Sequence, residues 1–179
     1  MMTDLITDLT RIEQLTEARR DEFEVLMYQL QHDDDLIDAQ IDALVDAIAA
    51  PIVAAIDCTA CGNCCRALTV HIYPEDIPRL AQGLDSSAED IEAQYVDRPD
   101  DLPSDVWGQF KQQPCALLCG NLCSIYENRP QACRDFPTFT PDFRWTLDYL
   151  MHNARICPII YNVLARMVSA ADELQRENP

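Results

Sequence analysis

Cys58-Thr59-Ala60-Cys61-Gly62-Asn63-Cys64-Cys65 decides how this chain is organised, because it holds four thiols in eight residues. Thiols at C-x2-C-x2-C spacing lie on a tight turn, where their sulfur atoms can converge on zinc or an iron-sulfur cluster. The terminal doublet is different, because adjacent side chains diverge on a helix and on a strand. We therefore expect Cys64 and Cys65 to face different partners, so that this stretch supplies only part of a ligand set.

The rest of that ligand set is expected from a second group of cysteines. The pair Gly120-Asn121 between short apolar runs predicts a tight hairpin with Cys115 on one arm and Cys123 on the other. The tripeptide Asn128-Arg129-Pro130 then predicts the start of a helical turn that holds Cys133 and Arg134. A further cysteine, Cys157, precedes Pro158.

Before the first cysteines the sequence predicts a helical hairpin. Residues from Thr3 to Gln31 contain no glycine or proline and place apolar side chains at helical intervals, which predicts one long helix. A second apolar stripe from Ile37 to Ile52 predicts a second helix, and Pro51 should kink or restart it near its end. A polar turn around residues 32–35 joins the two helices.

After the first cysteines the sequence predicts a series of short strands and helices. We predict a strand within 68–73, a helix from Pro74 to Gly83, a helix to about Val96 that a Ser86–Glu89 capping box begins, and a short helix over 104–110. The last predicted elements are a helical region through Trp145 and Leu150 and a terminal helix over 159–175. The predicted fold is mostly α, with an N-terminal hairpin (1–56) and a loop-rich cysteine-cluster domain with short β elements around a metal centre (57–179).

Composition limits the partners. The 179 residues include 13 Lys and Arg against 31 Asp and Glu, a formal charge of -18 that repels nucleic acid and anionic membrane surfaces. The start has neither the basic nor the apolar region of a secretory signal, so we expect a cytoplasmic protein. A reducing compartment keeps the nine cysteines free, and clustered free thiols favour metal binding.

The two cysteine blocks resemble a known family. The first block, followed by Pro114-Cys115 and by Cys123-Ser-Ile-Tyr126-Glu127-x-Arg129-Pro130-x-x-Cys133-Arg134-x-Phe136-Pro137, is similar to the CxxCxxCC, or YkgJ-like, cysteine cluster family. The resemblance covers about residues 57–137 and implies a domain that chelates zinc or iron. A related cysteine cluster occurs in flagellin lysine N-methylases. Cys119 is not part of the family pattern.

Spacing and resemblance together give a set of candidate metal ligands, with zinc and iron, including an iron-sulfur cluster, as the candidate metals. The first three cysteine positions match the ferredoxin run, but Cys65 follows directly where that run has x3-C-P. A site built from distant segments should contribute much of the folding free energy from Asp57 onward. The ligand set is Cys58, Cys61, Cys64, Cys65, Cys115, Cys123, Cys133 and Cys157.

Arg66, Arg129 and Arg134 lie beside these cysteines, and we expect their guanidinium groups to stabilise the anionic thiolates around a bound metal. No catalytic constellation is visible apart from the cysteines, and none of the three histidines has a ligand-like partner nearby in the sequence. Three functions remain compatible with the sequence. The first is a structural or metal-handling protein, in which the N-terminal helices can also bind a protein partner. The second is an iron-sulfur redox or methyl-transfer accessory enzyme. The third is a thiol redox sensor that uses Cys64 or Cys65.

Overall fold

The computed structural model describes residues 5–33 and 35–177 of the chain. These residues form ten α-helices, two short 3-10 helices and five short strands, which confirms the predicted mostly helical fold with short β elements. They divide into two compact units, one made of residues 1–57 and 137–179 and the other of residues 58–136. We call them the helical unit and the cysteine unit. The sequence had assigned 137–179 to the cysteine domain, whereas the structure groups this segment with the N-terminal helices.

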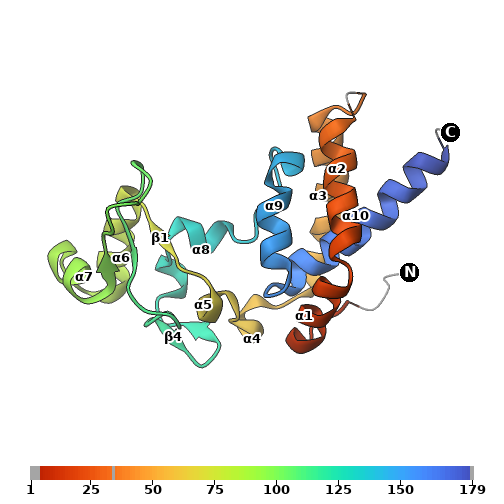
Figure 1. The fold of residues 1–179 in the computed structure, drawn as a ribbon. Helices are drawn as coiled ribbons and strands as arrows, with labels where there is room; N and C mark the ends of the chain where they lie inside the picture. Colours follow the sequence, from red (N-terminus) through yellow and green to blue (C-terminus); the bar gives the residue numbers. More distant parts are fainter. Residues whose placement is uncertain (1–4, 34, 178–179) are drawn as a thin grey trace. The chain divides into compact units, whose positions relative to one another are not determined.

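The helical unit is a bundle in which helices from both ends of the chain pack together. In Figure 1, α2 and α3 lie beside α9, and α10 passes behind them, as their contacts also indicate. Its core contains side chains with almost no exposed surface, such as Phe23, Ile52, Phe143 and Leu164. The bundle consists of α1 (Leu9–Ala18), α2 (Arg20–His32), α3 (Asp38–Ala55), α9 (Phe143–Ala154) and α10 (Pro158–Glu177).

The predicted long N-terminal helix is two helices. Asp8 caps α1 by accepting a hydrogen bond from the Arg11 amide at 2.7 Å, and the helix ends at Arg19, whose backbone leaves the helical region at φ -107° and ψ 13°. The Arg19 guanidinium pairs with Glu22 and lies 5.5 Å from the Phe23 ring. The break involves neither glycine nor proline, so the pattern gave no signal of it. Thr3 and Asp4 of the predicted helix and Asp34 of the predicted turn lie outside the described residues.

The helix predicted from the second stripe is confirmed as α3, and it continues through Pro51 to Ala55 without restarting. Its Asp42 carboxylate accepts hydrogen bonds from the Asp142 and Phe143 amides at 2.9 and 3.0 Å, where α9 begins. Distant parts of the chain therefore meet at the N-terminus of α9.

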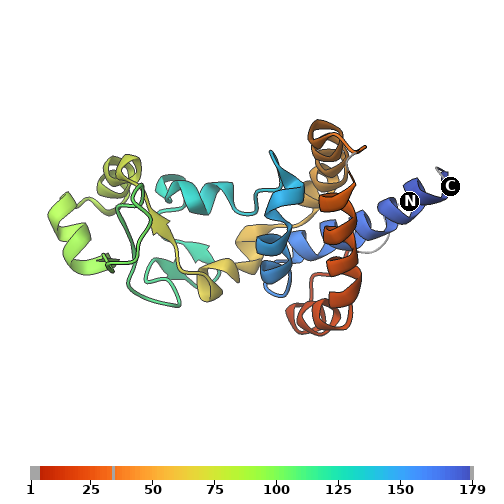
Figure 2. The same ribbon diagram turned by 45° about the horizontal axis from the view of Figure 1, so that its top comes forward.

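The cysteine unit is built on a small antiparallel sheet, with strand order β1-β3-β2, and a separate hairpin, β4-β5. Helices α6 and α7 lie side by side at one end of this unit in Figures 1 and 2. One apolar cluster, formed by Ile72, Leu80, Ile91, Val96, Phe110, Leu117 and Ile125, fills the interior. The elements are α4 (Cys58–Cys61), α5 (Cys64–Ala67), β1 (His71–Ile72), η1 (Pro74–Asp76), α6 (Ile77–Leu84), α7 (Ala88–Tyr95), β2 (Val96–Asp97), β3 (Gly108–Phe110), β4 (Leu118–Cys119), β5 (Leu122–Cys123), η2 (Tyr126–Asn128) and α8 (Gln131–Asp135).

Two local predictions in this unit are wrong. Residues 104–110 do not form a helix, since Gly108–Phe110 is the central strand β3 between β1 and β2. A Cβ atom on Gly108 would lie 2.4 Å from Cγ1 of Val96, so glycine is what lets the strands approach. The helix α7 is capped by Ser87, one residue after Ser86, which was the predicted cap. The Ser87 hydroxyl accepts a hydrogen bond from the Asp90 amide at 3.2 Å.

The predicted hairpin around Gly120-Asn121 is confirmed as β4-β5, with Cys123 on its second strand, but Cys115 lies before β4 and not on the first arm as predicted. The predicted helical turn at Cys133 is confirmed as α8. The predicted strand within 68–73 is β1, and the predicted terminal helix is α10. Within the described residues, none of the helices combines the length and the apolar character needed to span a bilayer.

Candidate metal centre

The first cysteine block folds as two helical turns joined at Gly62. The Gly62 amide donates to the Cys58 carbonyl at 3.0 Å and ends α4, and α5 begins at Cys64. Gly62 has a left-handed backbone, φ +59°, and a Cβ atom there would lie 2.7 Å from the backbone oxygen of Asn121. Glycine is therefore required both by the turn and by the close approach of the hairpin.

The hairpin lies directly against this block. The Cys115 amide donates to the Cys65 carbonyl at 2.8 Å, which joins the entry of the hairpin to α5. In the β4-β5 ladder Leu118 pairs with Cys123. Cys115 and Cys123 are both partly buried and pack against the apolar cluster of the unit. The backbone bond thus places Cys115 next to Cys65, and the hairpin that follows carries Cys123.

Cys133 arrives on α8, which a buried carboxylate holds in place. Asp76, 1% exposed, accepts hydrogen bonds from the Tyr73 amide at 3.1 Å and from the Gln131 amide at 2.7 Å. The second bond satisfies the first amide of α8, so Asp76 caps this helix from a segment more than fifty residues away in sequence. Asp76 therefore determines where the turn that carries Cys133 begins.

Four thiols influence one another electrostatically. Burial, and after it negative charge on Cys65, Cys115 and Cys123, together raise the pKa of Cys133 to about 12. Burial also raises the pKa of Cys115 and that of Cys123, and charge on Cys65 adds to both increases. These thiols therefore form one group. It consists of Cys65 on α5, Cys115 just before β4, Cys123 on β5 and Cys133 on α8.

Cys65 is the acidic member of this group. A hydrogen bond from the Cys64 thiol and, to a smaller extent, the charges of Arg66 and Arg129 lower the pKa of Cys65 to about 6, against the effect of burial. The two side chains of the doublet therefore contact each other, where the sequence predicted that they diverge.

The three arginines have different neighbours. The positive charge of Arg129 lowers the pKa of Cys65, Cys123 and Cys133, and its guanidinium lies 3.8 Å from the centre of the Tyr126 ring. Arg66 donates to the carbonyls of Cys61 and Gly120 at 2.9 and 2.8 Å. Arg134 donates to the Arg129 carbonyl and to the Gln131 side chain. Arg129 is thus the arginine that acts on most of the four thiols.

Two of the remaining cysteines adjoin this group, since Cys64 hydrogen-bonds to Cys65 and charge on Cys119 adds to the increase in the pKa of Cys123 that burial causes. Cys58 and Cys119 are exposed, and Cys61 and Cys64 are partly buried. Cys157 belongs to the helical unit, where it is 6% exposed at the start of α10, and its charge contributes to the raised pKa of Tyr149. That Cys58, Cys61, Cys64 and Cys157 are metal ligands stays a prediction.

The four grouped thiols fit zinc or iron by their chemistry, because thiolate sulfur is a preferred donor for both metals. Among the residues that the structure describes, no three side chains of His, Cys, Asp or Glu are placed to hold a metal ion as they stand. The cysteine side chains have three staggered rotamers about χ1, so a metal that binds here has to gather the sulfur atoms by rotation.

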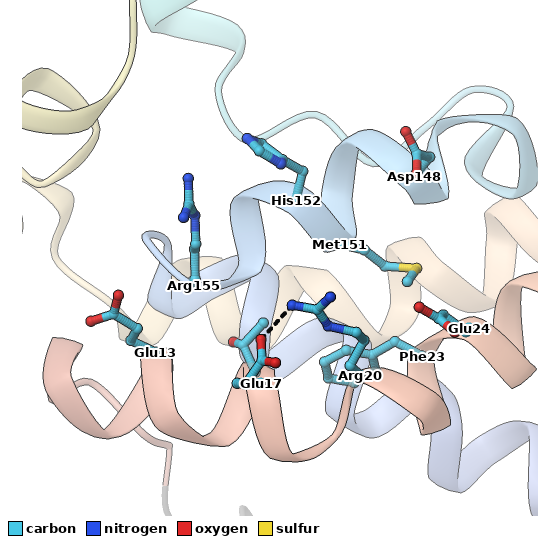
Figure 3. A pocket seen from close by; sticks show the side chains of 10 residues that line it. Glu13, Glu17, Arg20, Phe23, Glu24, Asp148, Met151, His152 and Arg155 are labelled. Atoms are coloured by element: carbon cyan, nitrogen blue, oxygen red, sulfur yellow. Dashed lines mark hydrogen bonds and ion pairs between the residues drawn. The ribbon is translucent and has the colours of Figure 1, made fainter.

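A groove in the helical unit offers a different kind of site. It has a volume of about 490 Å³ and lies among α1, α2 and α9, with Phe23 and Met151 among its lining residues (Figure 3). Its charged side chains, including His152, Arg155 and the Arg20–Glu17 ion pair, are exposed and carry both signs. Exposed charges of this kind contribute little binding free energy because water competes for them. The cysteine unit therefore remains the candidate site.

Sequence reasoning missed two residues that build the site, Asp76 and Asn121. Asp76 was read only as part of a helix start. Asn121 was read only as a turn residue, yet its side-chain amide donates to the Ala60 carbonyl at 2.7 Å. Partners so far away in sequence leave no local signal, so both roles require the fold.

The chain matches a model of a known family. A family model described as "CxxCxxCC: Putative zinc- or iron-chelating domain" matches residues 57–158. Comparisons with curated proteins and with solved structures give no match.

Proposed function

Since the chain belongs to the CxxCxxCC family of zinc- or iron-chelating domains, we propose that its cysteine unit binds one of these metals through Cys65, Cys115, Cys123 and Cys133. The proposed role is structural or metal-handling. The family match supports metal binding in general, and the choice of ligands rests on the contacts within the unit.

The observation that carries the proposal is the position of Cys133. Its thiol is partly buried and experiences charge on each of the other three, although the four residues come from separate segments between 65 and 133. Isolated buried cysteines act as small apolar side chains and need no such grouping. Four thiols from four segments are instead the usual ligand set of a structural zinc site and of many iron-sulfur centres.

The charges around these thiols support the same proposal. Four thiolates around a divalent ion carry a net charge of about -2, in a chain whose formal charge is already -18. The positive charges of Arg66 and Arg129 favour the thiolate form of Cys65 and offset part of that excess. A bound metal ion would supply crosslinks among four segments of the unit.

The test is anaerobic purification followed by elemental analysis and a visible absorption spectrum. We expect stoichiometric zinc in a colourless protein, or iron in a coloured one. The Cys133→Ser variant should lose the metal, whereas Cys119→Ser, a matched change at an exposed cysteine of the same unit, should retain it. A wild-type protein without either metal, or a Cys133→Ser variant that keeps its metal, contradicts the proposal.

A Cys157→Ser variant decides whether the ligand set extends beyond the cysteine unit. If the four grouped thiols suffice, this variant keeps the metal content of the wild type. The side chain of Cys157 is buried in the helical unit, so the comparison is made at a temperature at which circular dichroism shows that both proteins are folded.

A further inference from the structure

The hydrogen bonds around Asn121 point to a positioning role that is separate from the thiols. We infer that Asn121 and Arg66 form a clamp that fastens residues 58–66, which carry Cys65, onto the β4-β5 hairpin and so sets the geometry of the metal site. This inference rests on the proposed function for its effect on metal affinity, and on the structure alone for the clamp itself.

The clamp consists of bonds that cross between the two segments. The Asn121 side-chain amide donates to the Ala60 carbonyl at 2.7 Å, while its carbonyl oxygen accepts from the Arg66 guanidinium. Arg66 also donates to the Gly120 carbonyl at 2.8 Å on the hairpin and to the Cys61 carbonyl at 2.9 Å within its own segment. Donor and acceptor of Asn121 are therefore both used, each toward the cysteine segment.

Asn121 is not needed for the turn in which it lies. Gly120 has φ +64°, whereas the backbone φ of Asn121 is not positive. A two-residue hairpin of this kind requires glycine only at its first central position, and the second accepts most residues. The side chain of Asn121 can therefore be changed without altering the turn chemistry, and its two hydrogen bonds are left as its role.

Gly62 shows how closely the clamped segments approach. A Cβ atom at Gly62 would lie 2.7 Å from the Asn121 backbone oxygen and 3.2 Å from an Arg66 nitrogen. The bond from the Cys115 amide to the Cys65 carbonyl lies at the other end of the same contact. The helix α5 is thus held at two places. Arg66 bonds to the hairpin turn at Gly120 and Asn121, and the Cys65 carbonyl accepts from the Cys115 amide before β4.

Arg66 was expected from the sequence to interact with the thiolates, and in the structure three of its hydrogen-bond acceptors are the Cys61 and Gly120 carbonyls and Asn121. Its charge still lowers the pKa of Cys65. Because Arg66 serves both purposes, a change at Arg66 would mix them. Asn121 carries no charge, so it isolates the mechanical part of the clamp.

The experiment compares three full-length variants with the wild type. Asn121→Ala removes both bonds of the side chain, Asn121→Asp keeps the acceptor for Arg66, and Leu122→Ala is a control at a 47% exposed neighbour on the same hairpin. Zinc affinity is measured by competition with a chromophoric chelator, and hydrogen exchange of residues 58–66 is measured on the metal-free proteins. Circular dichroism checks that each variant is folded.

Asn121→Ala should raise the zinc dissociation constant about tenfold, the lower end for two lost hydrogen bonds, because Asn121 is exposed and water competes there. Asn121→Asp should recover part of this loss, and Leu122→Ala should match the wild type. In the metal-free protein, Asn121→Ala should speed exchange in 58–66 and leave the β1-β3-β2 sheet unchanged.

The inference is overturned if Asn121→Ala and Leu122→Ala give the same zinc affinity and the same exchange. It is also overturned if exchange rises throughout the cysteine unit, since Asn121 would then support the fold in general. If the wild type binds neither zinc nor iron, the proposed function fails, and the exchange of 58–66 still decides whether the clamp exists.

Discussion

Replacing Asp76 should destabilise the cysteine unit more than any change at an exposed acidic residue. Asp76 is almost fully buried, and its two carboxylate oxygens accept from two backbone amides, those of Tyr73 and Gln131. One bond caps η1 and the other caps α8. Asp76→Ala therefore removes a side-chain link between the start of α6 and the turn that carries Cys133.

The expected loss follows from these two bonds. A hydrogen bond to a charged group contributes about 1.5–3 kcal/mol, so the two together set an upper range of about 3–6 kcal/mol. Gln131 is exposed, so water replaces part of its lost bond, and we expect about 3 kcal/mol for Asp76→Ala. Asp76→Asn keeps the shape and one acceptor, so about 1–2 kcal/mol should be lost.

Urea unfolding of the metal-free, reduced protein measures these differences. A Trp145→Phe background leaves Trp107, which packs against the apolar cluster, as the fluorescent reporter of the cysteine unit. Asp105→Ala, at an exposed position in the same unit, is the matched control and should change the unfolding free energy by less than about 0.5 kcal/mol. An Asp76→Ala variant as stable as Asp105→Ala refutes the assignment of Asp76 as the cap of α8.

Two further predictions concern the thiols. In the metal-free protein, iodoacetamide should modify Cys65 first, at a rate that rises with pH around a midpoint of about 6 and then levels, because only the thiolate reacts. Cys64→Ala should move that midpoint upward, because it removes the hydrogen bond that lowers the pKa of Cys65 most. Mass spectrometry of quenched samples measures the modification of Cys65 in the wild type and in the variant. An unchanged midpoint would contradict the hydrogen bond from Cys64 to Cys65. Zinc affinity should increase with pH between 6 and 8, because Cys115, Cys123 and Cys133 have raised pKa values and must release protons to bind metal. Proton release measured by calorimetry in buffers of different ionisation enthalpy checks this, and a pH-independent affinity would count against thiolate ligation.

Local chemistry made much of this fold predictable. The Gly120-Asn121 turn, the Asn128-Arg129-Pro130 helix start and the apolar stripe of α3 each depend on residues close in sequence, and each prediction was confirmed. The 104–110 segment failed for the opposite reason. It becomes the central strand because its neighbours are β1 and β2, which come from other parts of the chain, and because Gly108 has no side chain to keep Val96 away.

The site divides in the same way. Cysteine spacing identified the candidate ligands, and it could not say which of them meet, because that depends on how Asp76, Asn121 and the Cys115 amide join separate segments. The doublet illustrates the limit. General helix geometry predicted that Cys64 and Cys65 diverge, yet in a helix of one turn the thiol of Cys64 hydrogen-bonds to that of Cys65.

The distribution of buried side chains indicates what a metal would stabilise. The cysteine unit spans residues 58–136, a size at which an apolar core alone gives marginal stability. Its buried apolar side chains belong to the sheet, to α6 and α7, and to the segments at Leu117 and Ile125, whereas α4, α5 and α8 contain no buried residue. The helical turns that carry Cys65 and Cys133 are thus held by hydrogen bonds to Asp76 and Asn121 rather than by apolar packing. A metal bound to these cysteines would add its binding free energy where the apolar core contributes least, so its removal should loosen α4, α5 and α8 before the sheet.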